Sequence, residues 1–370
     1  MSTANDGRIK EGLRQTLRDL SGLHGVSGFE QSVVRYTRQR FATVVEQVET
    51  DRHGNITATK RGHQHAPVLM ISAHMDEIGF IVKGIEPNGF LRFDRIGGAG
   101  DAVLSCRKVD VNGHFGLIGS VSGHLGSAAQ LGRVTPISEL YIDIGVSSAA
   151  EVAAMGIGIG DQVSFIGELT EFTGGDRVCA KGMDDRAGLA ILIQVLTELK
   201  DEIPFGSVRA VATVLEQVGH RGAAMAAYRI EPDYAIAIDG VPAGDTPDLS
   251  TTKDIPSVMG NGAVVLLATS TGELNVRGNI SHPAMKRLLL AAAANGEVPV
   301  QFATTINRGS TEAGLIHISR SGVPAISVGV PRRYSYSPHE MIDLRDAAAA
   351  VNLIVQFVRE MASHTDLGFL

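Results

Sequence analysis

The chain has 370 residues and a mass of 39.1 kDa, which is long for one hydrophobic core and suggests two domains. Its formal net charge is −7 and its isoelectric point is about 5.9, so we expect no nucleic-acid partner. Cys106 and Cys179 lack metal-finger spacing, and no apolar run approaches the ~18 residues that cross a bilayer, so we expect a cytoplasmic protein without a membrane span.

The first 77 residues show an α/β pattern. Apolar spacing predicts helices over residues 7–23 and 28–41, and strands over 44–50 and 55–60. The run PVLMISA at 67–73 is continuously apolar, which is typical of a strand buried on both faces of a sheet. We therefore expect this strand near the centre of a sheet.

The pattern changes between Gly79 and Thr173. Short alternating segments, separated by Gly, Asn and Asp, predict strands at 79–85, 90–96, 108–111, 114–120 and 162–165. Few helical patterns interrupt them. We therefore predict an inserted, β-barrel-like domain over residues 78–171, with residues 1–77 and 172–370 forming the other domain.

Helical patterns return after Thr173 and alternate with apolar strands. Helices are predicted at 184–200, from 222 to 228, and at 281–295, 312–321 and 344–364, and strands at 207–215, 233–238, 300–306 and 325–330. The predicted fold class is α/β, with a mixed sheet covered by helices on both faces.

Ligand-type side chains come directly after several of these apolar segments. His74 and Asp76 follow PVLMISA, Glu216 and Gln217 follow SVRAVATVL, Asp239 ends DYAIAID, and Asp184 opens a predicted helix. Ligands bind at the carboxyl ends of the strands in open α/β sheets, so we expect these side chains to converge. Histidine and carboxylates together suit zinc, cobalt or manganese.

Each residue also has an ordinary interpretation when it is taken alone. His74 and Asp76 could form a surface turn, Asp184 could cap its helix, and Asp239 with Gly240 is a common turn pair. The joint pattern favours a metal site because all the segments would end at one edge of the same sheet.

Several motifs resemble the glutamyl-aminopeptidase and tetrahedral (TET) aminopeptidase family, in order and over almost the whole chain. They are HMDEIGF (His74–Phe80), LYIDIG (Leu140–Gly145), KGMDDRAG (Lys181–Gly188), LEQVGHRGA (Leu215–Ala223), AIDG (Ala237–Gly240) and VPRRYSYSPHEMIDLRD (Val330–Asp346). The resemblance implies a zinc-peptidase-like fold, peptide substrates and a homo-oligomer, expected to be a dodecamer in which the inserted domain supplies contacts and controls substrate access.

The resemblance also implies roles for individual residues. His74 and Asp239 would bind a first metal ion and Asp184 would bridge it to a second, while Asp76 would hold His74 in place. Glu216 would be the general base that takes a proton from the attacking water.

The second metal position departs from the family pattern. The family reads Glu-Glu where this chain has Glu216-Gln217, and it has a histidine ligand where this chain has Tyr336. Glutamine is a weak neutral donor and tyrosine a poor ligand at neutral pH. We therefore predict one tightly bound divalent ion per subunit, zinc or cobalt first and manganese next. His339, three residues beyond Tyr336, is the alternative ligand if the loop shifts.

Two functions follow from these expectations. The first is a metal-dependent aminopeptidase that removes N-terminal residues from short peptides, weakly if the second ion is missing. The alternative is a catalytically silent relative that serves binding or scaffolding, which the replaced residues Gln217 and Tyr336 favour. Hydrolysis of another amide also remains open. His74, Asp76, Asp184, Glu216 and Asp239 together favour the peptidase.

Overall fold

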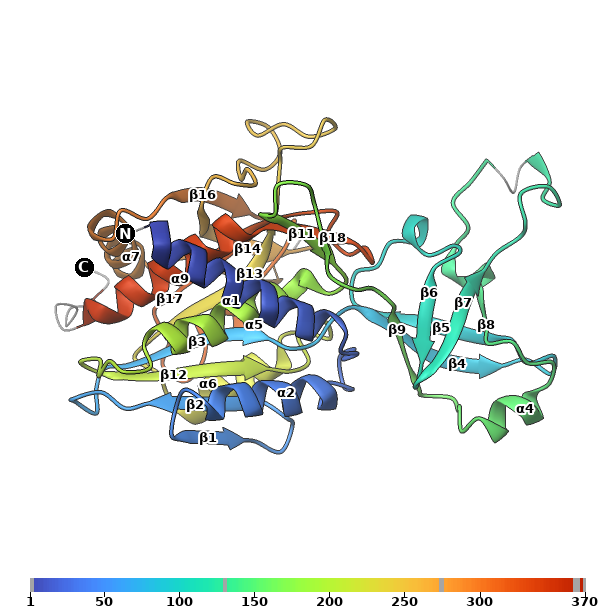
Figure 1. Cartoon of the computed structure of the whole chain (residues 1–370), viewed down its shortest axis with the longest axis horizontal. Coiled ribbons are helices and arrows are strands. Elements are labelled where there is room, and N and C mark those ends of the chain that lie inside the picture. The colour runs from blue at the N-terminus through green and yellow to red at the C-terminus, as the bar shows by residue number, and fades with distance from the viewer. Residues whose placement is uncertain (1–2, 129–131, 273–275, 362–366, 369–370) are drawn as a thin grey trace.

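The computed structural model describes residues 3–128, 132–272, 276–361 and 367–368. A large sheet with its helices forms one part of the molecule, and a closed β-barrel projects from one end of it (Figure 1). The fold class predicted from the sequence is confirmed: a mixed α/β sheet with helices on both faces, plus a barrel.

The large sheet has twelve strands among the described residues, and four parallel ones form its centre in the order β12-β3-β13-β17. Antiparallel strands extend both ends. The strands are β1 (Gln47–Thr50), β2 (Ile56–Lys60), β3 (Val68–His74), β10 (Thr170–Glu171), β11 (Arg177–Ala180), β12 (Ser207–Thr213), β13 (Tyr234–Pro242), β14 (Ala263–Thr271), β15 (Val276–Ile280), β16 (Val300–Thr305), β17 (Ala325–Arg333) and β18 (Glu340–Asp343).

Helices cover both faces because successive residues of the central strands point to opposite sides. On β3, Leu69 and Ile71 belong to the core shared with α1, α5 and α9, whereas Met70 packs with Ala223 and Ala227 of α6. The helices of this part are α1 (Thr3–Ser21), α2 (Gln31–Ala42), α5 (Met183–Glu198), α6 (Arg221–Ile230), α7 (Pro283–Asn295), α8 (Ala313–Ile316) and α9 (Leu344–Arg359).

The barrel closes in the order β4-β5-β8-β7-β6-β9 and has its own core. Phe80 lies at the centre of this core, with its ring centroid 5.1 Å from that of Phe93 and 5.2 Å from that of Phe165, both edge to face. The elements are β4 (Gly79–Ile85), β5 (Leu91–Ile96), β6 (Lys108–Val111), β7 (His114–Gly119), β8 (Tyr141–Asp143), α4 (Ala149–Ala154) and β9 (Gln162–Phe165).

A buried ion pair ties the barrel to the sheet. Glu77, just before β4, accepts hydrogen bonds from Lys181 Nζ at 2.7 and 2.8 Å and from Ser164 of β9 at 3.1 Å. Both strands at the junction are therefore held by one carboxylate. Burial alone would raise the pKa of Glu77, but the charges of Lys181 and Arg186 lower it, so the carboxylate stays ionised.

Several predicted elements differ from the structure. The helix predicted at 312–321 is only α8, because a turn follows it in which Arg320 and Gly322 have positive φ. The last helix ends at Arg359, and the predicted stretch over 362–364 lies outside the described residues. The structure also contains elements that were not predicted: β8, β10, β11, β14, β15, β18 and α4.

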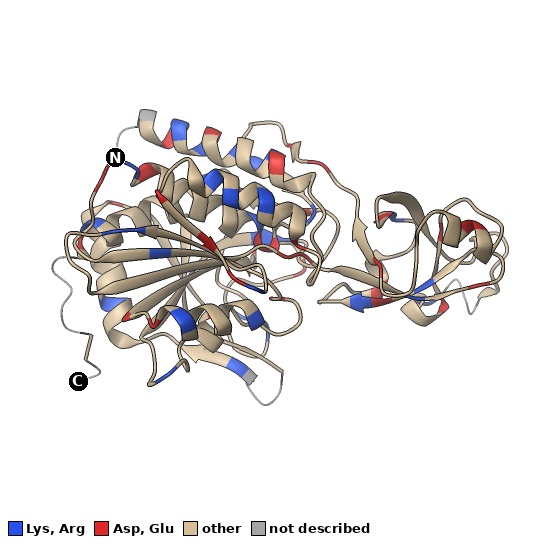
Figure 2. Ribbon diagram, turned by 90° about the horizontal axis from the view of Figure 1, so that it is seen from below, with Lys and Arg blue, Asp and Glu red and all other residues tan. Residues whose placement is uncertain are grey.

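Lysine and arginine are interspersed with aspartate and glutamate over both parts of the chain (Figure 2). The formal net charge of −7 means that acidic residues outnumber basic ones. None of the described helices combines the length and the apolar character needed to cross a bilayer.

Candidate metal centre

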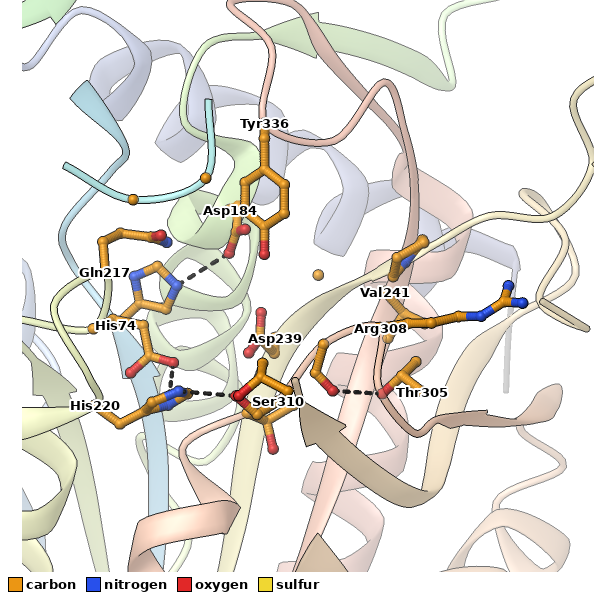
Figure 3. Close-up of a pocket in the computed structure, with 18 of the residues that line it drawn as sticks. His74, Asp184, Gln217, His220, Asp239, Val241, Thr305, Arg308, Ser310 and Tyr336 are labelled. Atoms are coloured by element: carbon orange, nitrogen blue, oxygen red, sulfur yellow. Dashed lines mark hydrogen bonds and ion pairs between the residues drawn. The ribbon is translucent and has the colours of Figure 1, made fainter. Parts of the chain in front are cut away.

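Three predicted ligands meet at the carboxyl edge of the central strands. His74 is the last residue of β3, Asp239 lies in the neighbouring β13, and Asp184 opens α5. One ligand atom from each residue lies within 4.8 Å of the other two. The side chains surround one space in Figure 3. The convergence predicted from the sequence is thus seen for these three residues.

Local backbone geometry directs these ligands. His74 Nδ1 donates to the backbone carbonyl of Asp76 at 2.9 Å, which turns Nε2 toward Asp184 Oδ1 at 3.1 Å. Asp184 and Asp185 have non-helical backbone angles although they stand in the first turn of α5. Because of this departure, the Asp184 side chain faces the sheet edge and does not cap the helix.

Asp76 has a wider role than the one predicted. Its carboxylate lies 3.4 Å from His74 Nδ1, but its hydrogen bonds come from the backbone N–H groups of Glu216 at 3.1 Å and Gln217 at 3.0 Å, and from the Ser27 hydroxyl. Asp76 is fully buried. It therefore fixes the loop after β12 against β3, and with it the start of the Glu216 side chain.

The electrostatics of the cluster favour a cation. His74, Asp184 and Asp239 are 1, 6 and 6% exposed. Burial, and then the charge of Asp185, raise the pKa of Asp239 well above its ordinary value. Burial alone would lower the pKa of His74, but the Asp76 carboxylate raises it well above its ordinary value. Buried carboxylates that resist ionisation fit a divalent ion, whose charge would offset their repulsion.

Glu216 lies in the same pocket and is held by His220, a histidine that is not among the predicted site residues. His220 Nδ1 lies 2.5 Å from Glu216 Oε1, and His220 Nε2 is 3.0 Å from the Ser310 hydroxyl. Glu216 Oε2 is buried and makes no hydrogen bond with the described residues. One oxygen of the predicted base is thus positioned while the other is free. The spacing of four residues between Glu216 and His220 is the signal that could have revealed this pair.

Gln217 and Tyr336 flank the centre without adding negative charge. Gly97 and Gly98 of the segment after β5 make room for them: a Cβ on Gly97 would lie 2.7 Å from Gln217 Oε1, and one on Gly98 3.2 Å from the Tyr336 ring. Tyr336 points its hydroxyl into the pocket (Figure 3). Burial raises the pKa of its phenol above the ordinary value, so Tyr336 stays neutral at neutral pH.

Arg332 contacts a predicted metal ligand, a role that its sequence context does not predict. Its side chain is 2% exposed, and its Nη1 lies 2.8 Å from Asp184 Oδ2. Arg333 points elsewhere and makes a bidentate pair with Asp245, with N–O distances of 2.9 and 2.7 Å. Adjacent arginines thus serve different ends: one contacts a predicted metal ligand and the other anchors the loop that carries Asp245.

His339 does not line this pocket. It is exposed and lies beside another hollow, lined by Cys106, Arg107 and Gly167. The structure therefore does not place His339 among the ligand atoms that gather around His74.

Glu312 lies buried beneath the centre and gives a test of its electrostatics. Its carboxylate accepts a hydrogen bond from Thr213, and burial, followed by the charge of Glu216, raises its pKa from 4.5 to about 7. The folded protein then holds this proton to a higher pH than the unfolded chain. The stability linked to it is present below pH 4.5 and is lost as the pH rises to about 7.

We expect Glu312→Gln to remove this pH-dependent loss of folding stability. Without metal, the free energy of unfolding of Glu312→Gln should rise relative to that of the unmodified protein as the pH goes from about 5 to about 8. This relative rise should be on the order of 3 kcal/mol at most. Chemical unfolding in the presence of a chelator at both pH values measures it. An unchanged difference between the two proteins at the two pH values would show that Glu312 titrates normally.

The fold and the site together define a metal-dependent hydrolase: buried histidine and carboxylate ligands at the ends of parallel strands, with a glutamate beside them. The pattern of the M42 glutamyl aminopeptidase family matches residues 54–353. The chain belongs to this family of metal-dependent aminopeptidases.

Individual relatives cover nearly the whole chain. The glutamyl aminopeptidase of Lactococcus lactis is 32% identical over 338 residues, covering 89% of this chain and 91% of its own. An aminopeptidase from Desulfurococcus kamchatkensis has a similar structure, with a TM-score of 0.87, 33% identity and 98% coverage of both chains. The TET1 peptidase of Pyrococcus horikoshii, described as assembling into a tetrahedron or a large octahedral shell, has a TM-score of 0.80, 28% identity and coverage of 94 and 99%.

Proposed function

We propose that this protein removes N-terminal residues from short peptides with one divalent ion per subunit, held by His74, Asp184 and Asp239. The observation that carries the proposal is the buried cluster of these three ligands beside Glu216 in one pocket of about 280 Å³. Zinc or cobalt suits this mixture of imidazole and carboxylate best, and manganese is the next choice.

The residues divide the chemistry between them. A divalent ion in this cluster would polarise the scissile carbonyl and lower the pKa of the attacking water. Glu216 takes the proton of that water on its free oxygen and passes it to the leaving amine. His220 keeps the other oxygen of Glu216 in place, and Asp76 holds the backbone from which Glu216 projects.

The alternative of a silent binding or scaffolding protein is less well supported. A binding protein has no need of a buried glutamate whose second oxygen makes no hydrogen bond in the described part of the chain, because such a group is costly to keep. The match to an aminopeptidase family also favours the enzyme. Gln217 and Tyr336 remain the features that a silent relative would best explain.

A panel of aminoacyl chromogenic amides, each with its N-acetylated counterpart, tests the proposed function. We expect hydrolysis of free-amine substrates after the protein is loaded with zinc, cobalt or manganese, and none of the acetylated ones. Equal hydrolysis of both forms would point to another amidase, and no hydrolysis of any substrate would favour the silent alternative.

We further propose that the protein assembles into a homo-oligomer, with a dodecamer as the expected form and the region 78–171 supplying contacts and limiting access. The barrel projects from the sheet and carries exposed apolar side chains at Phe115, Leu117 and Leu125. The P. horikoshii TET1 peptidase is described as assembling into a tetrahedron or a large octahedral shell. An enclosed site would admit peptides and exclude folded proteins. The two unpaired cysteines fit a reducing compartment, so we place the protein in the cytoplasm.

We expect a particle of twelve subunits of 39.1 kDa, about 470 kDa, at micromolar concentration. Mass photometry measures this directly. A change of Phe115 and Leu117 to Ser should lower the particle mass if the barrel supplies contacts, whereas Phe172→Ser, an exposed position outside the barrel strands, is the control. A stable monomer of the unmodified protein would contradict the proposed assembly.

A further inference from the structure

The Asp184 carboxylate is divided between two different partners. Its Oδ1 faces His74 Nε2 at 3.1 Å, on the side of the proposed metal ion. Its Oδ2 faces Arg332 Nη1 at 2.8 Å, on the other side. An aspartate that bridges two cations presents one oxygen to each, and here the second of the two places is taken by a guanidinium.

The fold builds an enclosed place for this guanidinium. Arg332 lies near the end of β17, which pairs with β13 so that Arg332 stands beside Pro242. Gly240 leaves the space that the side chain crosses, since a Cβ there would lie 3.1 Å from Arg332 Cζ. Arg332 is also 5.5 Å from the centre of the Tyr336 ring. The guanidinium therefore has a fixed position with little exposure to water.

A second buried carboxylate completes the arrangement. Glu340 Oε1 lies 3.1 Å from Arg332 Nη1, and Glu340 Oε2 accepts a hydrogen bond from the backbone N–H of Asp184 at 2.9 Å. Glu340 Oε1 also accepts from the backbone N–H of Tyr336 at 2.7 Å. Arg332 thus sits between two carboxylates that are themselves tied to the loops bearing Asp184 and Tyr336. The Asp184 and Glu340 carboxylates therefore enclose the Arg332 guanidinium.

We propose that Arg332 is the second cation of this metal centre: a tethered guanidinium that occupies the place beside Asp184 and so limits the centre to one divalent ion. The proposal rests on the one-ion site of the proposed function. An arginine keeps its charge at any physiological pH. A divalent ion about 4 Å away would be repelled by it. Glu340 is already paired with Arg332, and Gln217 and Tyr336 supply no charge to offset that repulsion.

The same contact positions the first ion's ligand. Arg332 forms an ion pair with the Asp184 carboxylate, and Glu340 holds the Asp184 backbone N–H, so the carboxylate cannot rotate away from His74 without losing its ion pair with Arg332. Arg332 is therefore a positioning residue that acts through Asp184. This role explains why a buried, costly arginine stands next to a metal site.

A second ion could be excluded by the missing ligands alone or also by the charge of Arg332, and the two explanations predict different ion counts. If Gln217 and Tyr336 alone kept the second ion out, then Gln217→Glu with Tyr336→His would admit it. If Arg332 also occupies the place, this double variant still binds one ion. Adding Arg332→Met, which keeps a similar stem without the charge, should then open the site to a second ion.

Titration of the metal-free full-length protein with Co²⁺ measures the number of ions bound per subunit. Calorimetry gives ions per subunit, and the visible absorption of cobalt reports each new coordination site independently of activity. We expect one ion in the unmodified protein and in the double variant, and two in the triple variant. The second ion should bind at least ~100-fold more tightly in the triple than in the double variant. The matched control adds Arg333→Met to the double variant in place of Arg332→Met. It removes the neighbouring charge that pairs with Asp245 and should leave the count at one ion per subunit.

Two ions in the unmodified protein or in the double variant would overturn the inference, and this comparison stands even if the triple variant fails to fold. A folded triple variant that binds one ion would overturn it as well. Failure of the proposed function looks different: the unmodified protein would then bind no ion, or would bind one and hydrolyse no substrate in the aminoacyl panel.

Discussion

Glu216→Gln is expected to lower kcat by about 10³-fold or more, because it removes the only proton acceptor that we assign to the attacking water. Gln has the same shape and can still contact His220, so the pocket should keep its form. Glu216 is not one of the three clustered ligands. The variant should therefore retain the metal content of the unmodified protein.

Steady-state kinetics together with metal analysis of the same samples measure both parts of this prediction. Glu46→Gln, at an exposed position before β1, is the matched control and should keep full activity. If Glu216→Gln were as active as the control, another group would have to be the base. If it lost its metal along with its activity, Glu216 would be a ligand and the division of roles proposed above would be wrong.

Asp239→Asn is expected to abolish tight metal binding, with the affinity falling by at least ~100-fold, more than the loss typical of an outer-shell change. The amide has no charge to offset that of the ion, and only His74 and Asp184 would remain. The metal-free variant should not lose stability, since replacing a buried carboxylate that resists ionisation removes a cost of folding.

Thermal unfolding with and without metal separates loss of binding from loss of folding. At a metal concentration ~1,000 times the dissociation constant of the unmodified protein, that protein should gain about 4 kcal/mol of stability, whereas Asp239→Asn, with an affinity at least ~100-fold lower, should gain about 1.4 kcal/mol or less. Asp201→Asn, an exposed position after α5, should behave as the unmodified protein does. Equal stabilisation of Asp239→Asn would mean that the ion binds elsewhere.

The barrel and the central strands could be predicted because their patterns are local. β3 is an uninterrupted apolar run, and β4 to β7 and β9 alternate between Gly-rich turns. β8, β11 and β18 are only three or four residues long, and β11 finds its partner β18 in a distant part of the chain. Their own sequences carry too few residues to show a period. β14 is different, since its run AVVLL has the pattern of a buried strand and could have been predicted from it.

Site residues could likewise be predicted where a local pattern marks them, but not where a side-chain contact defines their role. His74, Asp184 and Glu216 stand next to strand or helix ends, and Asp239 lies in the last half of β13, so the rule for α/β sheets brings them together without knowledge of side chains. The rule says nothing of Arg332, which acts on Asp184 across the sheet edge, nor of the Asp76 carboxylate binding the backbone of Glu216 and Gln217. Those contacts depend on side-chain directions that periodicity does not contain.

The most direct test of a one-ion aminopeptidase is to follow hydrolysis while metal is added to the metal-free protein. Zinc, cobalt and manganese would each be titrated against a cleaved free-amine substrate, with bound ions counted in the same samples. The account predicts that activity rises in proportion to occupancy and levels off at one ion per subunit. Activity that appears only as a second ion binds would contradict it, as would full activity in the metal-free protein.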